Sequence, residues 1–331
     1  MMKNTKCLTW VGKLTSAVAG ALLVCAGVSA QTAFADRPIR IVVPYPAGGT
    51  TDLLARAVAP KLGERLGRTV VIDNRPGAGG VIGSQQVAKS PADGHSLVFA
   101  SIASHGIIPA LQTPPPYDPV TDFVPITLVA STPNVLLANN DLPVKNLKEL
   151  IALAKAKPGT INFGSTSHGG SPHMSGELLK SMAGIDIVHV PYKGGSPMLV
   201  DLIGGQVGIG IDNLPSSMAF IKSGKVRALA VTTTKRWPGA PEIPTMAEAG
   251  VPGYDVSAWF GLMAPAGTPQ PLVDELSRHL MAILRTPEIE KQFFELGAQP
   301  VGDTPAEFKA FIVGERDKWS GVAKSNNIKL N

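Results

Sequence analysis

Short apolar runs alternate with longer segments of helical spacing along most of the chain. The short runs are rich in β-branched residues, as buried strands are. After the first run, one apolar stripe recurs every four residues and ends near Gly67: Leu54, Val58, Leu62 and Leu66. This spacing predicts an amphipathic helix whose apolar side faces a sheet. Strands that alternate with helices in this way predict parallel α/β layers.

The other elements follow from the same pattern. We expect strands at residues 39–44, 70–73, 97–101, 161–165, 187–192, 207–212 and 226–232. Besides the stripe, we expect helices at residues 147–157, 172–183, 197–204, 272–284, 287–296 and 305–322. Two proline-rich segments, 113–119 and 237–244, predict loops, because proline fixes φ and lacks an amide donor.

The N-terminal residues predict export from the cytoplasm. Three lysines precede an apolar stretch at residues 17–28, and Ala33-Phe34-Ala35 stands before Asp36. This pattern is typical of a cleavable signal peptide, here residues 1–35, with cleavage after Ala35. The apolar stretch is shorter than the roughly 20 residues that a membrane-spanning helix needs. We therefore expect a periplasmic protein.

Both cysteines of the chain, Cys7 and Cys25, lie within the predicted signal peptide. A lipid anchor on Cys25 is the alternative, but Val24 stands where lipoprotein signals require a very small residue. Without these cysteines the protein has no disulfide, although its compartment would permit one. About 300 residues bury enough surface to fold without such links, and their number predicts two domains.

The charge of the chain indicates a small partner. Three lysines and no acidic residue precede Asp36, so the formal net charge falls from +5 to +2 on cleavage. Basic residues form no cluster and aromatic residues are few, which argues against nucleic acid or a lipid surface as a partner. We expect a monomer that binds a small molecule.

Two glycine-containing turns join a strand to a helix, and the first of them contains Gly48 and Gly49. Unpaired amides at the helix start, together with the helix dipole and threonine hydroxyls, suit a carboxylate without any cationic side chain. Asp52 is interpreted as a partner of the helix dipole in the first turn. The alternative is a plain turn whose helix is capped by Thr50 or Thr51.

The second turn offers three adjacent hydroxyls, on Ser165, Thr166 and Ser167, and another helix start relaxed by glycine. Two such sites can hold both ends of one anion. The alternative is a turn with a serine cap and with Pro172 at the first helical position.

Two further strand ends carry polar candidates. Lys193 follows the strand at residues 187–192, where it either meets a carboxylate or remains solvated above a capped helix. Asp212 ends the strand at residues 207–212, where it either accepts a ligand amine or caps the next helix.

His168 and His173 suggest a metal site, but two residues five positions apart do not share one helical face. Since no neighbouring Cys or Asp completes a ligand set, we expect no metal there. His173 is interpreted as a capping or ligand-facing residue.

The chain also lacks the marks of a cofactor site or a nucleophile. The segment at residues 74–83 is similar to a dinucleotide-binding loop, but its third glycine is displaced by one residue and Pro76 interrupts the turn. We interpret it as a surface turn at the rim of a cleft. The Gly-x-Ser-x-Gly elbow of hydrolases is missing as well. We expect no cofactor and no enzymatic activity.

Together these segments resemble the substrate receptors of tripartite tricarboxylate transporters, also called Bug receptors. The resemblance spans the chain after the signal peptide. Its motifs, in order, are RPIR (37–40), PAGGTTD (46–52), NRPGAGG (74–80), ADGHSL (92–97), YKGG (192–195), PTMAEAG (244–250), WFGL (259–262) and APAGTP (264–269).

The resemblance implies a type II periplasmic binding protein fold, with two α/β domains, a ligand cleft between them and two crossover strands. Domain 1 would comprise residues 36–133 and 258–331, and domain 2 residues 134–257. The domains would close over a carboxylate that backbone amides, hydroxyls and ordered water hold. The implied ligand-binding residues are Tyr45, Ala47, Gly48, Gly49, Thr50, Ser165, Thr166, Ser167, Gly169, Gly170, His173, Tyr192, Lys193 and Asp212.

We therefore expect a receptor that captures a di- or tricarboxylate, an aromatic carboxylate or an acidic amino acid for membrane permease subunits. One alternative is a sensor protein that presents the same ligand to a two-component system. Another is a secreted α/β enzyme that acts on a carboxylated substrate, but the chain shows no set of nucleophile, base and acid for it.

Overall fold

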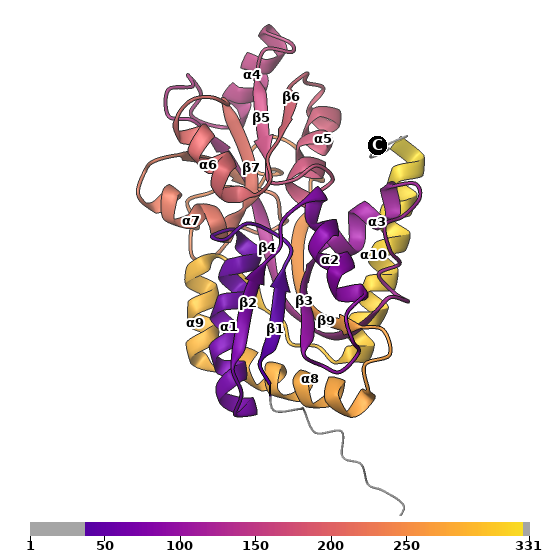
Figure 1. The fold of residues 1–331 in the computed structure, drawn as a ribbon. Coiled ribbons are helices and arrows are strands. Elements are labelled where there is room, and N and C mark those ends of the chain that lie inside the picture. The colour runs from indigo at the N-terminus through magenta and orange to yellow at the C-terminus, as the bar shows by residue number, and fades with distance from the viewer. Residues whose placement is uncertain (1–36, 327–331) are drawn as a thin grey trace, which may run out of the picture. The chain divides into compact units, whose positions relative to one another are not determined.

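The computed structural model describes residues 37–326, so the predicted signal peptide lies outside the described residues. The described strands form one sheet in the order β2-β1-β3-β9-β4-β7-β5-β6 (Figure 1). β8 and β10 also pair with β4. Their bounds are β1 (Ile39–Val43), β2 (Val70–Asn74), β3 (Ser96–Ser101), β4 (Phe123–Ala138), β5 (Asn162–Ser165), β6 (Val188–Pro191), β7 (Ile209–Asn213), β8 (Arg227–Val231), β9 (Ser257–Pro265) and β10 (Gln299–Pro300).

The long strand β4 divides this sheet into two parts. Its residues 123–133 pair with β9, and its residues 134–138 pair with β7 and β8. We call β2, β1, β3, β9 and the first part of β4 the first half-sheet. The second part of β4, with β7, β8, β5 and β6, is the second half-sheet.

The sheet is mixed, whereas the sequence pattern predicted parallel layers. β1 is parallel to β2 and β3, and β5 is parallel to β6 and β7, as expected. The central strands differ, because β4 and β9 run antiparallel to each other and to their neighbours. These two strands are buried on both faces along most of their length, so they lack the polar alternation that marks a half-buried strand.

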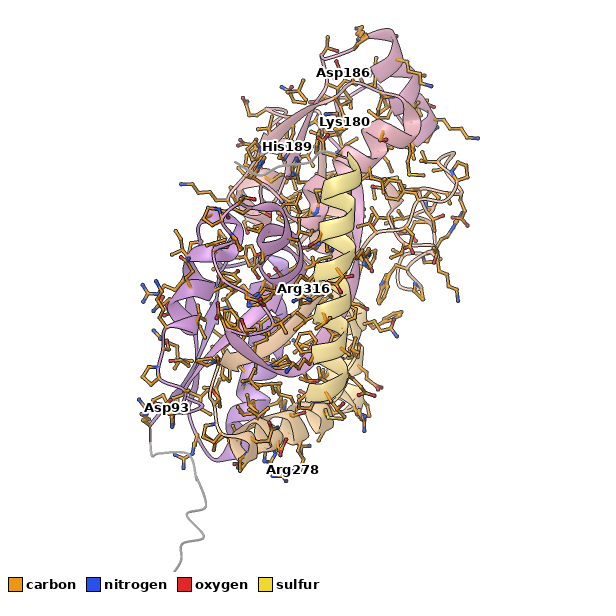
Figure 2. All side chains as sticks on the ribbon, turned by 90° about the vertical axis from the view of Figure 1, so that its right-hand side faces the viewer. Asp93, Lys180, Asp186, His189, Arg278 and Arg316 are labelled. Atoms are coloured by element: carbon orange, nitrogen blue, oxygen red, sulfur yellow. The ribbon has the colours of Figure 1, made fainter. Side chains whose placement is uncertain are left out.

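Helices cover both half-sheets. Their bounds are α1 (Thr50–Leu66), α2 (Val81–Ala88), α3 (Ile108–Leu111), α4 (Leu147–Ala156), α5 (Ser171–Ala183), α6 (Gly195–Ile203), α7 (Leu214–Lys222), α8 (Gln270–Leu284), α9 (Pro287–Leu296) and α10 (Pro305–Asn326), with short helices η1 (Ala78–Gly80) and η2 (Ala103–Ile107). The last helix, α10, packs along β4, η2 and α3 and is seen in its full length in Figure 2. Within residues 37–326, no helix is both long and apolar enough to span a bilayer.

The helix predicted from the leucine and valine stripe is confirmed as α1. It ends at Leu66 and is capped by Gly67, whose φ of 62° lies in the left-handed region that glycine adopts without strain. The segment at residues 74–83 is not only a surface turn, since η1 and the start of α2 lie within it. Gly77, Gly79 and Gly80 take positive φ values, and such turn residues give no sign of the helix start in the sequence.

Each half-sheet has its own hydrophobic core. The core of the first half-sheet includes the fully buried Ile41, Leu54 and Phe99. In the second half-sheet, successive side chains of β4 point to opposite faces of the sheet, because side chains alternate along a strand. Leu136 packs in one cluster with Phe163 and Tyr254, and Leu137 packs in another with Met198 and Val231. The domain boundaries at residues 133/134 and 257/258 stay a prediction.

The buried carboxylate of Glu315 joins α10 to β9. Its Oε2 accepts hydrogen bonds from the indole Nε1 of Trp259 at 2.9 Å and of Trp319 at 3.1 Å. Both rings are buried, so neither donor can turn to bulk water.

Glu315→Leu should lower the free energy of unfolding by about 2 kcal/mol or more, because it leaves two buried indole donors without an acceptor. Glu315→Gln keeps an acceptor oxygen at nearly the same place and should lose less. Urea unfolding followed by tryptophan fluorescence measures both values. Equal losses in the two variants would show that the hydrogen bonds contribute little.

Candidate functional site

A hollow of about 450 Å³, part of which is open to solvent, lies between the two half-sheets. The residues that line it from the first half-sheet and its connections are Tyr45, Pro46, Gly49, Thr50, Thr51, Ser101, Ile102, Ala103 and Phe260. Those that line it from the second are Thr166, Ser167, Gly170, Ser171, Pro172, Gly194, Gly195, Asp212 and Asn213. None of these lining residues is Arg, Lys or His. We call this hollow the cavity.

Four of the described helices begin at the wall of the cavity. Their N-cap residues, all of which line it, are Gly49 of α1, Gly170 of α5, Gly194 of α6 and Asn213 of α7. None of these N-caps makes a side-chain capping hydrogen bond. The same holds for α2, α3 and α8 elsewhere in the described chain, whereas Asn146 of α4 and Thr286 of α9 do make one. First-turn amides and positive helix ends therefore face the cavity, an arrangement that suits an anion.

The first turn is held in place by Asp52. The amide of Gly48 donates to the Asp52 carboxylate at 2.9 Å, and Arg56 and Asn74 also donate to it. Burial opposes ionisation, but the hydrogen bonds from Arg56, Gly48 and Asn74 outweigh it and hold the pKa of Asp52 below its usual value. Asp52 thus serves its own helix start, and its charge is balanced by Arg56 rather than by a ligand.

On the side away from the cavity, two histidines form hydrogen bonds with the second turn. The amide of Gly169 donates to Nδ1 of His173 at 3.0 Å. The Ser165 hydroxyl lies 2.7 Å from Nε2 of His189, on β6, and so points away from the cavity. Thr166 and Ser167 line the cavity instead.

Asn134 on β4 joins two of the helix starts. Its side-chain oxygen accepts hydrogen bonds from Ser171 at the start of α5 and from Asn213 at the start of α7. Its side-chain amide donates to the hydroxyl of Ser175, one turn further along α5. Asn134 is fully buried at the point where β4 passes between the half-sheets. It fixes both helix starts relative to the crossing strand, and no sequence motif marked it.

Asp212 is the one carboxylate among the lining residues. Burial raises its pKa to about 6, against the effect of hydrogen bonds from Ser216, Asn213 and Ser217. Above this pH the cavity contains one negative charge. Below it the cavity offers an additional O–H donor.

The two half-sheets touch at the edge of the cavity. The hydroxyl of Thr50 donates to that of Ser216 at 3.1 Å, and the amide of Ser216 lies 3.3 Å from the Thr50 oxygen. Nearby, the hydroxyl of Ser196 donates to the carbonyl of Ala47 at 3.2 Å. The first turn is therefore bonded to α6 and α7, and the structure shows the two sides of the cavity in contact.

The structure brings half of the predicted site residues to the cavity. Those that line it are Tyr45, Gly49, Thr50, Thr166, Ser167, Gly170 and Asp212. Those that do not are Ala47, Gly48, Ser165, Gly169, His173, Tyr192 and Lys193. Lys193 is exposed, and the Tyr192 hydroxyl donates to Asp201 at 2.8 Å.

Ser101 is a lining residue that the sequence did not single out. Its hydroxyl lies 2.7 Å from the hydroxyl of Tyr45, which donates to the carbonyl of Gly79. Burial raises the pKa of Tyr45 to about 12, so its proton stays in place near neutral pH. The sequence could have indicated Ser101, because this residue lies at the carboxyl end of a predicted parallel strand. α/β proteins bind ligands at such strand ends.

Comparison with known proteins gives one consistent result. Residues 54–328 match the family model described as tripartite tricarboxylate transporter family receptor. The protein BugT of Bordetella pertussis is 40% identical over 331 residues, which are 99% of this chain and 100% of BugT.

Two solved structures of bacterial receptors agree with this. The structure of R. palustris Rpa4515 with adipate is 42% identical, with a TM-score of 0.86 over 88% of this chain and 98% of that one. MatC (Rpa3494) from Rhodopseudomonas palustris with bound malate is 32% identical, with a TM-score of 0.82 over 86% of this chain and 98% of that one. The fold is that of periplasmic binding proteins, and the chain belongs to the tripartite tricarboxylate transporter receptor family.

Proposed function

We propose that this chain captures a small carboxylate in the periplasm and delivers it to the membrane subunits of a tripartite tricarboxylate-type transporter. The observation that carries the proposal is the meeting of four helix starts without side-chain caps at one cavity. Backbone amides in this arrangement complement a carboxylate although no basic side chain lines the cavity. The adipate and malate in the two related structures support the same class of ligand.

The ligand lies between the two turns in this proposal. Amides at the start of α1 hold one end of it, because the hydroxyl of Thr50 already donates to Ser216 and that of Ser101 is paired with Tyr45. Amides at the start of α5 and the hydroxyls of Thr166 and Ser167 hold the other. A dicarboxylate matches this two-ended arrangement, because each end meets a positive helix terminus from a different half-sheet.

The proposal requires that the ligand be bound and released unchanged. Mass spectrometry of the small molecules released from the purified, denatured protein should identify a carboxylate in about equimolar amount. Adipate and malate, added to protein stripped of this molecule, serve as probes in titration calorimetry. A protein that retains no carboxylate and binds no member of a panel of di- and tricarboxylates would contradict the proposal, as would catalytic turnover of the bound molecule.

Gly49→Val should abolish measurable binding of such a carboxylate or weaken it by about ten- to a hundredfold. Each charge-assisted hydrogen bond contributes roughly 1.5 to 3 kcal/mol, and the added methyl groups keep the carboxylate from the amides. The fold should persist, because Gly49 has an extended backbone with a φ of −78° and a Cβ there meets only Pro46 O at 3.6 Å.

Lys193→Met is the matched control for the Gly49 variant. Lys193 is exposed and does not line the cavity, so its removal should change the affinity far less. Titration calorimetry with the same carboxylate measures both variants. Normal binding by the Gly49 variant, together with lost binding in the Lys193 variant, would replace the helix-start mechanism by a salt bridge.

The affinity for malate should rise several-fold as the pH falls from about 7.5 to about 6. The pKa of Asp212, about 6, lies above its usual value, so protonation in this range removes a charge that repels an anion and adds a donor. Asp212→Asn should remove the pH dependence. A ligand with an ammonium group beside Asp212 should show the opposite slope, so glutamate as a second probe distinguishes the two classes. An identical slope in the parent protein and the variant would exclude Asp212 as its source.

A further inference from the structure

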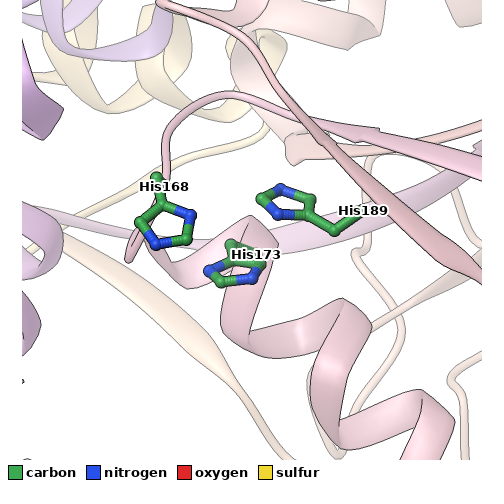
Figure 3. Close-up of side chains that lie close together, drawn as sticks. All are labelled: His168, His173 and His189. Atoms are coloured by element: carbon green, nitrogen blue, oxygen red, sulfur yellow. The ribbon is translucent and has the colours of Figure 1, made fainter. Parts of the chain in front are cut away.

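Three histidines lie together behind the second turn, outside the cavity (Figure 3). His168 belongs to the loop between β5 and α5, His173 to the first turn of α5, and His189 to β6. One ring nitrogen from each can be chosen so that all three lie within 4.8 Å of one another. The rings of His173 and His189 are stacked, with centroids 3.8 Å apart, and His168 lies 4.9 Å from His173.

The three rings come from separate segments, so the group exists only in the folded chain. His189 stands well beyond the other two in the sequence, which is why the sequence pattern showed an incomplete ligand set. His168 is exposed, His189 is half-buried and His173 is buried. The group therefore has a protein-covered side and a side from which a solvated ion can enter.

Imidazole nitrogens bind a metal only through an unprotonated lone pair. Nδ1 of His173 accepts the amide hydrogen of Gly169, so this nitrogen carries no proton. The His173 ring therefore already has an unprotonated lone pair. Neutral imidazole is a preferred ligand of Zn²⁺, Cu²⁺ and Ni²⁺.

We propose that His168, His173 and His189 form a binding site for one divalent transition-metal ion of the zinc, copper or nickel class. Three protein ligands with one open position are a common arrangement for such ions. The carboxylate of Glu177 lies 3.9 Å from Nε2 of His173 and is placed to offset the charge of the ion. Lys180 forms an ion pair with Glu177 at 3.1 Å and opposes the ion, and His189 and Lys180 are labelled on the same side of the molecule in Figure 2.

Coordination requires the rings to turn. The three ring planes are now nearly parallel, with angles of 17° to 27°, so their lone pairs do not point to one position. Ligand nitrogens around a tetrahedral ion, each about 2.0 to 2.1 Å from it, are roughly 3.3 Å apart. Coordination therefore requires the exposed His168 ring to rotate and the rings of His173 and His189 to turn out of their stack.

Metal binding has a consequence for the second turn. Nδ1 of His173 now accepts the amide hydrogen of Gly169. A neutral imidazole has a single lone pair, so a metal bound to either nitrogen of His173 removes that hydrogen bond. His189 has no such conflict, because its Nε2–H can donate to Ser165 while Nδ1 binds the ion, as outer partners of metal-bound histidines do. The metal should therefore loosen the loop at Gly169.

The loop ends at Gly170, which lines the cavity. If this loop holds a carboxylate, a bound metal should weaken carboxylate binding, and by reciprocity the carboxylate should weaken metal binding. This consequence rests on the function proposed above. The metal site itself does not.

Titration calorimetry with ZnCl₂, in a buffer that does not chelate and without any carboxylate, tests the site. The parent protein should bind one equivalent. His168→Ala and His189→Gln should each weaken binding by at least tenfold, while circular dichroism and the melting temperature stay close to those of the parent. His279→Gln, on the distant helix α8, is the matched control and should bind like the parent. Absence of binding, or binding that survives both cluster variants, would overturn the proposal.

Two spectroscopic measurements separate this site from weak surface binding. Pulsed electron paramagnetic resonance with one equivalent of CuCl₂ should show imidazole coordination that diminishes in His168→Ala and persists in His279→Gln. Hydrogen exchange of the peptide that contains Gly169 should be faster with ZnCl₂ than without it, and only in proteins with the intact cluster. Unchanged imidazole signals in His168→Ala, or exchange at Gly169 that zinc does not alter, would contradict the proposed coordination. Neither readout uses a carboxylate, so failure of the proposed function would leave them intact.

Discussion

The cavity depends on how β4 passes from one half-sheet to the other. This strand pairs with β9 on one side of the crossing and with β7 and β8 on the other. Asn134 lies at that point, fully buried, and its side chain binds the starts of α5 and α7. A buried amide must satisfy its donors and acceptor within the protein, so its partners have little freedom to move. The second side of the cavity thus takes its geometry from a residue that does not itself line it.

The proposed anion site has no basic side chain among its lining residues. Helix starts leave amides that must find an acceptor, and no N-cap side chain provides one in the four helices that begin at the cavity. In α7 the amide of Ser216 is bonded to Thr50 instead. Arg56 lies near the first turn, but its charge is already paired with Asp52. Fixed amides and hydroxyls give directional contacts, so the position of each carboxylate group should matter more than the total charge of the ligand. Asp212, as a buried acid near its ionisation point, adds the single group whose charge changes with pH.

One side of the loop at residues 166–170 faces the cavity, and the other side faces the histidine cluster. Thr166, Ser167 and Gly170 line the cavity, and the histidine cluster lies behind the same few residues. The hydrogen bond from Gly169 to His173 joins the two sides. Any change in the protonation or coordination of His173 therefore acts on a segment that also shapes the cavity, and this coupling follows from chain connectivity rather than from a long pathway.

The sequence by itself determined the alternation of strands and helices, the stripe that became α1, and the two glycine turns, because each of these depends on neighbours close along the chain. Half of the site residues that it predicted line the cavity, since a strand, a glycine turn and a helix start form one local unit. The central strands β4 and β9 were less evident, because burial on both faces removes the polar alternation on which a sequence pattern depends. Only the tertiary structure decided the role of Asn134, the place of Ser101 in the wall and the meeting of His189 with His168 and His173. Each of these contacts joins residues far apart in the sequence. The spacing of residues within one segment does not indicate which distant segment a side chain will contact.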